Sequence, residues 1–244
     1  SSKQKSVPHL DKGVLNRLRR QARLQIESRN QPRPLFEVQR AELGSSLRGV
    51  ALLPPASRSD VFFDIEGFPL HDGGLEYLFG VAFLERGKPK FRDWWAHDDR
   101  EEKQAFEGFI DWVHARWRRD PSMHIYHYAN YEVSAVRRLM GKYATREAEV
   151  DDLLRNEVFV DLYSIVRNGL IVGTPSYSLK DIEKLYMEAR SGAVTTAGGS
   201  IVAYHRWLES GEEPEPDRSP ILKEIRDYNE EDCHSTRLLA EWLR

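Results

Sequence analysis

Two carboxylates stand in a run of residues that otherwise belongs in a buried strand. The stretch DVFFDIEGFP, residues 60–69, places Asp64 and Glu66 among aromatic and β-branched side chains. Residues two apart on a strand share one face of the sheet, so the two carboxylates lie side by side. A buried carboxylate is costly unless it is neutralised, and oxygen ligands suit Mg²⁺ or Mn²⁺. The stretch predicts a divalent-metal site, with an ordinary surface strand as the alternative.

A second acidic motif lies near the end of the sequence. The stretch YNEEDCHSTRLL, residues 228–239, places Tyr228 and Asp232 four residues apart, hence on one face of a helix. This pair combines a metal ligand with a phenol that can orient or deprotonate an attacking water. The alternative is the polar side of an ordinary amphipathic helix.

Two further acids lie near the ends of predicted strands in the middle of the sequence. In IYHYANYEVSAVRRL, residues 125–139, Glu132 falls in the first turn of a helix, where the helix dipole favours a negative charge. It can reach a cleft at the sheet edge, or it is a simple helix-terminal charge. Asp161 ends the strand in VFVDLYS and is a rival ligand, although we favour it as the cap of a helix that starts near Tyr163.

The elements that must position these acids follow from periodicity and turn residues. Strands are expected at 61–66, 76–84 and 90–96, and the turn sequences HDGG and ERGK between them predict an antiparallel meander. Helices at 100–118, 131–143 and 146–155 then alternate with strands at 123–128 and 158–162. This order predicts an α/β fold with a mixed five-stranded sheet and helices on both faces. Residues 191–200 and 209–220 are expected to be loops, and a final helix is expected from residue 219.

The first 57 residues differ in charge from the rest. They hold 11 Lys or Arg against 4 Asp or Glu, whereas the remainder holds 25 against 35. Residues 10–29 predict a basic amphipathic helix with Leu15, Leu18, Ala22 and Ile26 as its apolar stripe. We therefore expect a basic helical arm and linker at 1–57 and one domain at 58–244. The arm is either a nucleic-acid contact or a solvated helix.

Together the motifs resemble a known family. An Asp-x-Glu pair on the first strand, an acid at the central strand-to-helix junction and Tyr-x-x-x-Asp on the last helix are similar to the DEDD, or DnaQ-like, 3′-to-5′ exonucleases of the RNase H-like fold. More narrowly, LLPPASRSDVFFDIEGFPL, GGLEYLFGV, VFVDLYSIV and SYSLKDIEKLY resemble the RNase H-like domain of putative RecB-family nucleases. The resemblance covers nearly everything from Leu53 onward.

The resemblance implies a set of site residues and two bound Mg²⁺ or Mn²⁺ ions. Asp64, Glu66, Glu132 and Asp232 take the places of the four acids, and Tyr228 takes the place of the tyrosine that defines one branch of the family. In a two-metal mechanism Asp64 bridges both ions, Glu66 and Asp232 hold one of them, and Glu132 acts through a water or the second ion. Glu132 departs from the family, which usually has Asp at this position.

The expected substrate is single-stranded nucleic acid, with DNA favoured over RNA. Candidate contacts to the strand are His127, Tyr128, Arg137, Arg138 and Lys180. The resemblance also implies neighbouring RecB- or Cas4-like nuclease and helicase domains in a longer chain. The alternatives are an exoribonuclease and a catalytically weak or inactive binding module.

Composition bounds the setting of the protein. The 244 residues are 40% hydrophobic, with no apolar run of the length that a membrane span requires. The single cysteine, Cys233, excludes an internal disulfide and a thiolate zinc site. We therefore expect a cytoplasmic protein without a membrane partner.

Overall fold

The computed structural model describes residues 11–39, 49–188 and 196–244. Its contacts divide the chain into two compact units. Unit 1 comprises Ser1–Leu53, Tyr163–Glu188 and Leu243–Arg244, and unit 2 comprises Pro54–Leu162 and Ala189–Trp242. The division after Leu53 lies close to the predicted boundary at residue 57. The grouping of residues 163–188 with the basic arm was not expected, and the independent domain at 58–244 stays a prediction.

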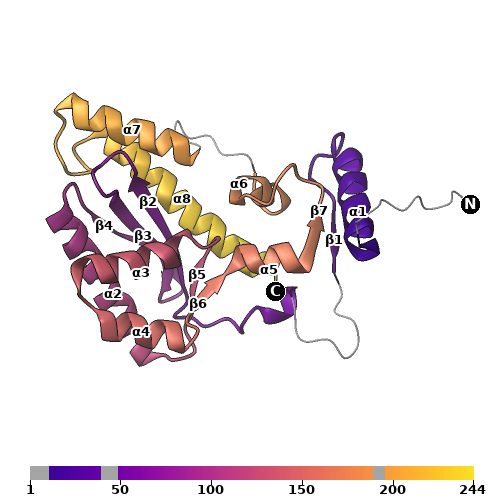
Figure 1. Cartoon of the computed structure of the whole chain (residues 1–244), viewed down its shortest axis with the longest axis horizontal. Coiled ribbons are helices and arrows are strands. Elements are labelled where there is room, and N and C mark those ends of the chain that lie inside the picture. The colour runs from indigo at the N-terminus through magenta and orange to yellow at the C-terminus, as the bar shows by residue number, and fades with distance from the viewer. Residues whose placement is uncertain (1–10, 40–48, 189–195) are drawn as a thin grey trace, which may run out of the picture. The chain divides into compact units, whose positions relative to one another are not determined.

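Unit 2 is built on a five-stranded mixed sheet (Figure 1). Its strands are β2 (Val61–Phe68), β3 (Leu75–Glu85), β4 (Lys88–Trp95), β5 (Ile125–His127) and β6 (Phe159–Asp161). They lie in the order β4-β3-β2-β5-β6. The β2–β3 and β3–β4 pairs are antiparallel, whereas β2–β5 and β5–β6 are parallel. The predicted meander followed by parallel strands is confirmed, and with it the α/β fold class.

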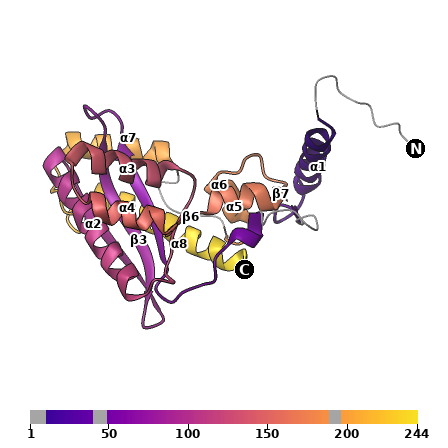
Figure 2. The same cartoon turned by 60° about the horizontal axis from the view of Figure 1, so that its bottom comes forward.

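One face of this sheet packs against three helices and forms the larger hydrophobic core. The helices are α2 (Asp99–Arg119), α3 (Tyr131–Tyr143) and α4 (Glu147–Arg155), which Figure 2 shows together on one side of the strands. Val61, Phe63 and Ile65 of β2 point into this core. Because side chains alternate along a strand, the intervening residues 62, 64 and 66 face the other side.

The other face is covered by α7 (Ala197–Ser210) and α8 (Pro220–Trp242). Gly80 of β3 lets α8 approach closely, since a Cβ at this position would lie 1.7 Å from Oδ1 of Asn229. The predicted final helix and the predicted loop at 209–220 agree with the bounds of α7 and α8.

The predicted loop at 191–200 is partly wrong. Residues 191–195 lie outside the described residues, but Thr196 caps α7 by accepting a hydrogen bond from the backbone N–H of Gly199, at 3.0 Å, and residues 197–200 are helical. Glycines disfavour a helix, which is why the sequence indicated a loop. The packing of Ala203, Tyr204 and Trp207 in the core of this face compensates for them.

Unit 1 is smaller. It contains α1 (Lys12–Ser28), β1 (Phe36–Val38), η1 (Gly49–Leu52), β7 (Leu170–Val172), α6 (Leu179–Ile182) and η2 (Glu183–Leu185), with α5 (Leu162–Gly169) beginning at the division. Strands β1 and β7 form an antiparallel pair, and α1 packs on β7. Within the described ranges, no helix of either unit has the length and apolar content to cross a membrane.

The apolar stripe predicted for α1 is not the face that packs. Leu24 is the buried residue of the helix, whereas Leu18 and Ile26 are 53% and 61% exposed. The packed face carries polar side chains instead, because Gln21 and Gln25 donate hydrogen bonds to backbone carbonyls of Val172 and Thr174. Edge carbonyls of a short strand attract such donors, which an apolar periodicity cannot reveal.

Candidate active site

The site begins with the geometry of β2. Asp64 and Glu66 leave the strand on the face that α7 and α8 cover, opposite to Phe63 and Ile65 in the main core. Asp64 is half-buried and Glu66 is buried. The alternation of the strand is therefore what separates the two carboxylates from the apolar core and presents them to the last helix.

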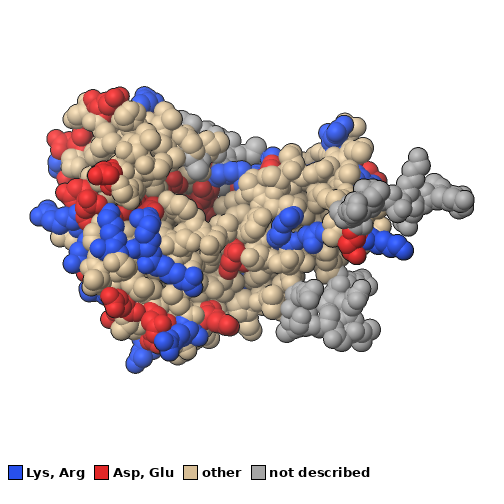
Figure 3. All heavy atoms as spheres, viewed as in Figure 1, with Lys and Arg blue, Asp and Glu red and all other residues tan. Residues whose placement is uncertain are grey.

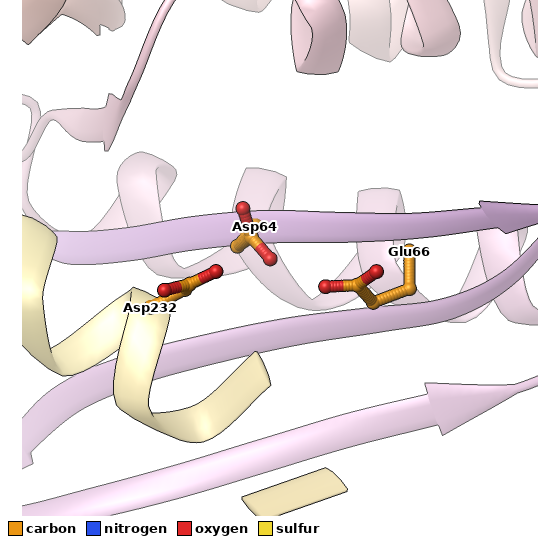
Figure 4. A group of neighbouring side chains, drawn as sticks. All are labelled: Asp64, Glu66 and Asp232. Carbon is orange, nitrogen blue, oxygen red and sulfur yellow. The ribbon is translucent and has the colours of Figure 1, made fainter. Parts of the chain in front are cut away.

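Helix α8 brings a third carboxylate to the same place. Asp64, Glu66 and Asp232 each offer an oxygen, and these oxygens lie within 4.8 Å of one another. Figure 4 shows the two carboxylates from β2 and the one from α8 turned toward a shared space. The structure thus brings together three predicted site residues that lie up to 168 positions apart. We call them the carboxylate cluster.

The composition of the carboxylate cluster fits a divalent cation. Three negative charges this close together repel one another, and burial of Glu66 and Asp232, both 6% exposed, strengthens the repulsion. A cation relieves it, and all-oxygen ligation suits Mg²⁺ and Mn²⁺ rather than zinc. Asp64, Glu66 and Asp232 are the residues that would hold such an ion.

Two neutral donors fix the carboxylates of β2. The side-chain amide of Asn229 donates to Oδ2 of Asp64 at 2.7 Å, and the hydroxyl of Ser200 donates to Oε2 of Glu66. Asn229 and Ser200 are both fully buried. Neither residue was expected at the site from the sequence. Asn229 follows Tyr228 directly in the last motif, so its place on α8 was a usable signal, whereas Ser200 lies in a stretch that predicted a loop.

Tyr228 adjoins the carboxylate cluster, as its spacing from Asp232 predicts. It is buried, at 4% exposure. Burial raises the pKa of the Tyr228 phenol above its ordinary value, and the nearby carboxylates add to the shift because a phenolate beside them is unfavourable. The phenol therefore keeps its proton in this environment. It is suited to orient a water as a hydrogen-bond donor and not to act as a base.

Glu132 is not part of the carboxylate cluster. Its Oε2 lies 3.5 Å from Nδ1 of His127 and has no hydrogen-bond partner. Burial raises the pKa of Glu132 above its ordinary value, while the contact with His127 opposes the shift. His127 is itself 2% exposed, with Nδ1 2.6 Å from the carbonyl of Ala129. In this structure His127 faces Glu132 and the backbone rather than solvent.

Asp161 also lies outside the carboxylate cluster. Its Oδ1 accepts a hydrogen bond from the backbone N–H of Ala129 at 2.9 Å. Ala129 has a φ of 72°, a left-handed conformation that costs energy for a residue with a Cβ. Asp161 thereby stabilises the turn between β5 and α3, which sets the start of the helix that carries Glu132.

The predicted cationic contacts differ in their surroundings. Figure 3 shows Lys and Arg side chains gathered over α2 and α3 of unit 2. Arg138 of α3 forms an ion pair with Glu76, which also accepts a hydrogen bond from the hydroxyl of Tyr131 at 2.9 Å. Arg137 is exposed on the same helix. Contacts of Arg137, Arg138 and the half-buried Tyr128 with a nucleic acid stay predictions, as does that of Lys180, which belongs to unit 1.

The fold and the carboxylate cluster define a class of protein. A mixed five-stranded sheet with helices on both faces, and acids converging from the central strand and the last helix, is the arrangement of an RNase H-like fold. A family model described as the RNase_H superfamily matches residues 61–244, and the chain belongs to this superfamily. Searches of curated proteins and of solved structures found no match. Membership indicates a nuclease, a hydrolase whose chemistry uses divalent metal ions.

Proposed function

We propose that the protein is a 3′-to-5′ exonuclease that hydrolyses single-stranded nucleic acid, with DNA as the favoured substrate. The observation that carries the proposal is the convergence of Asp64, Glu66 and Asp232. The adjoining Tyr228 supports the finer assignment, because the similarity to tyrosine-type DEDD exonucleases includes a tyrosine four residues before the last acid.

The proposed mechanism uses two Mg²⁺ or Mn²⁺ ions. Such ions supply a hydroxide nucleophile at neutral pH and stabilise the charge that develops on the departing oxygen. Asp64, Glu66 and Asp232 would hold the metal site, and Glu132 would act through a water or the second ion. The protonated phenol of Tyr228 donates a hydrogen bond that orients the attacking water toward the phosphorus atom.

The surroundings of the site are also part of the proposal. Arg137 and Arg138 on α3 are proposed contacts for the phosphate backbone, together with Lys180, and Tyr128 is a proposed contact for a base. His127 is proposed to influence the bound nucleic acid only indirectly, through its contact with Glu132. The resemblance to RecB-family nucleases supports a setting in a longer chain with nuclease and helicase domains.

A binding module without catalysis is the second candidate function. It is favoured by the place of Glu132, whose carboxylate is paired with His127 and lies outside the carboxylate cluster. A site that holds its ion through only three acids would bind metal and nucleic acid yet cut slowly. An exoribonuclease is a third candidate, which differs only in the polymer.

One cleavage experiment separates these candidates. Single-stranded DNA and RNA, each labelled at the 5′ or the 3′ end, are incubated with the protein and Mn²⁺ or with a chelator. We expect a 5′-labelled strand to give a ladder and a 3′-labelled strand to release labelled mononucleotide at once. Chelation is expected to stop both reactions.

The matched variants lie on one helix. Asp232→Asn removes one charge from the carboxylate cluster and is expected to slow cleavage roughly 100-fold or more. Asp227→Asn makes the same change at an exposed position of α8 that pairs with Lys223, and is expected to cleave normally. Metal binding without cleavage by the wild type would favour the binding module, and faster cleavage of RNA would favour the exoribonuclease.

A further inference from the structure

We infer that Ser200, at the start of α7, is a positioning residue for Glu66, and that Tyr77 holds Ser200 in turn. The inference rests on the proposed function only in that it takes Glu66 to be a metal ligand. It adds α7 to the working parts of the site, beyond the two elements that carry the carboxylate cluster.

The three side chains form a buried hydrogen-bonded chain. The hydroxyl of Ser200 donates to Oε2 of Glu66, and the hydroxyl of Tyr77 lies 2.8 Å from Oγ of Ser200. A carboxylate can only accept, and a serine hydroxyl has one proton to give. Tyr77 must therefore be the donor to Ser200, so both protons of the chain point toward Glu66. Ser200 and Tyr77 are both completely buried, which excludes water as a substitute donor.

An irregularity in the sheet aims Tyr77 at this chain. The register of β2 and β3 shifts between Glu66 and Gly67, where the partners change from Leu78 to Glu76. Tyr77 is the extra residue of this β-bulge, and bulges commonly redirect a side chain next to an active site. Here the bulge turns Tyr77 toward α7, where it packs in the same core as Leu78.

The ring of Tyr77 also docks α7. It stacks on Tyr204, one helical turn beyond Ser200, with ring centroids 3.9 Å apart and planes 8° apart. Ser200 is thus held from two directions, by its own helix and by the phenol beneath it. Ser200 lies in the first turn of α7, where the helix dipole favours an anion such as the Glu66 carboxylate.

The consequence is a fixed rotamer for Glu66. A ligand whose oxygen is held by a second partner is already oriented for metal binding, and loss of such partners typically weakens metal affinity 10–100-fold. Ser200, which supplies this second partner, lies 134 positions away from Glu66 in the sequence.

The test is direct Mn²⁺ binding to the whole protein, measured by electron paramagnetic resonance of free Mn²⁺ and by the rise in Tm with Mn²⁺. Ser200→Ala is expected to raise the Mn²⁺ dissociation constant by roughly 10–100-fold. Tyr77→Phe keeps the stacked ring and removes only the phenol oxygen, so a smaller rise is expected. At saturating Mn²⁺ both variants are expected to recover most of the wild-type cleavage rate, a recovery that a merely unfolded variant would not show.

Ser210→Ala, at the other end of α7, is the matched control, because the hydroxyl of Ser210 donates to the backbone carbonyl of Trp207 and does not reach Glu66. It is expected to bind Mn²⁺ as the wild type does. Asp64→Ala reports on the proposed function itself and is expected to abolish binding at the site.

Unchanged Mn²⁺ affinity in Ser200→Ala overturns the inference if Asp64→Ala has lost binding. If Ser200→Ala does not fold, unchanged affinity in Tyr77→Phe overturns it instead. Wild-type binding by Asp64→Ala contradicts the proposed metal site.

Discussion

The carboxylate cluster and Glu132, both in unit 2, differ in what surrounds their carboxylates. In the carboxylate cluster, Asp64 and Glu66 accept hydrogen bonds from the neutral amide of Asn229 and the neutral hydroxyl of Ser200. Glu132 instead faces the imidazole of His127, whose Nδ1 lies 3.5 Å from Oε2 of Glu132. Neutral donors orient a carboxylate and leave its charge for a cation, whereas the contact with His127 opposes the rise in the pKa of Glu132 that burial causes. On this basis we propose that the carboxylate cluster is the primary metal site and that Glu132 has a secondary role.

The largest effect is expected from Asp64→Asn. Removing the central charge of the carboxylate cluster is expected to lower the cleavage rate roughly 100-fold or more and to abolish the rise in Tm with Mn²⁺. Without metal the variant is expected to be at least as stable as the wild type, because one of three mutually repelling charges is gone. Differential scanning fluorimetry with and without Mn²⁺ measures both results. Asp72→Asn, in the exposed turn after β2, is the control; equal responses of the two variants to Mn²⁺ would contradict the comparison.

Glu132→Gln is expected to distinguish the role of Glu132 from that of the carboxylate cluster. The cleavage rate is expected to fall roughly 10–100-fold because the contribution to the second ion is lost. The Mn²⁺-dependent rise in Tm is expected to persist, since the carboxylate cluster is intact. Loss of Mn²⁺ binding as complete as in Asp64→Asn would show that Glu132 belongs to the same coordination sphere.

A third variant tests whether the hydrogen bond from Asn229 positions Asp64. Gly80→Ala places a methyl group where the Asn229 side chain now lies, so that the side chain must move away from Asp64. We expect a loss of about 1–3 kcal/mol in the free energy of unfolding. A rise of roughly tenfold in the Mn²⁺ dissociation constant is expected as well. Gly141→Ala on α3, where the added methyl group meets open space, is the control. Destabilisation without any change in Mn²⁺ affinity would mean that Asn229 does not position Asp64.

The smallest effect concerns pH. Burial raises the pKa of Glu132, so the metal-free folded protein binds this proton more tightly than the unfolded chain does. Its contribution to stability is therefore greatest at low pH and declines as the pH rises from the ordinary glutamate value through the folded value. Glu132→Gln has no such proton, so its stability relative to the wild type is expected to increase with pH. Denaturant unfolding across this pH range measures the free energy of unfolding of both proteins. Parallel pH profiles of the two free energies would contradict a raised pKa of Glu132 in the folded protein.

The features that depend on local periodicity could be predicted from the sequence. Alternation along β2 placed Asp64 and Glu66 on one face, and the four-residue spacing on α8 placed Tyr228 beside Asp232. These relations depend only on backbone geometry, which a short stretch determines. The order of strands and helices likewise followed from turn residues and apolar patterns.

The remainder depends on contacts between distant segments. Ser200 reaches Glu66 because aromatic packing holds α7 in place against the low helix propensity of its glycines, and a local pattern contains no sign of this. The exposed stripe of α1 shows the same limit, since polar contacts of Gln21 and Gln25 to backbone carbonyls decide which face packs. The left-handed turn at Ala129, just before the helix that carries Glu132, is likewise supported by Asp161 from another strand, which no local pattern reveals.

The most direct test of the central claim is an anomalous difference map from crystals of the protein grown with Mn²⁺. We expect a manganese peak bound by carboxylate oxygens of Asp64, Glu66 and Asp232, and no such peak in crystals of Asp232→Asn at the same Mn²⁺ concentration. A wild-type map without a peak between these three side chains, or with Asp232 turned away from β2, would contradict it.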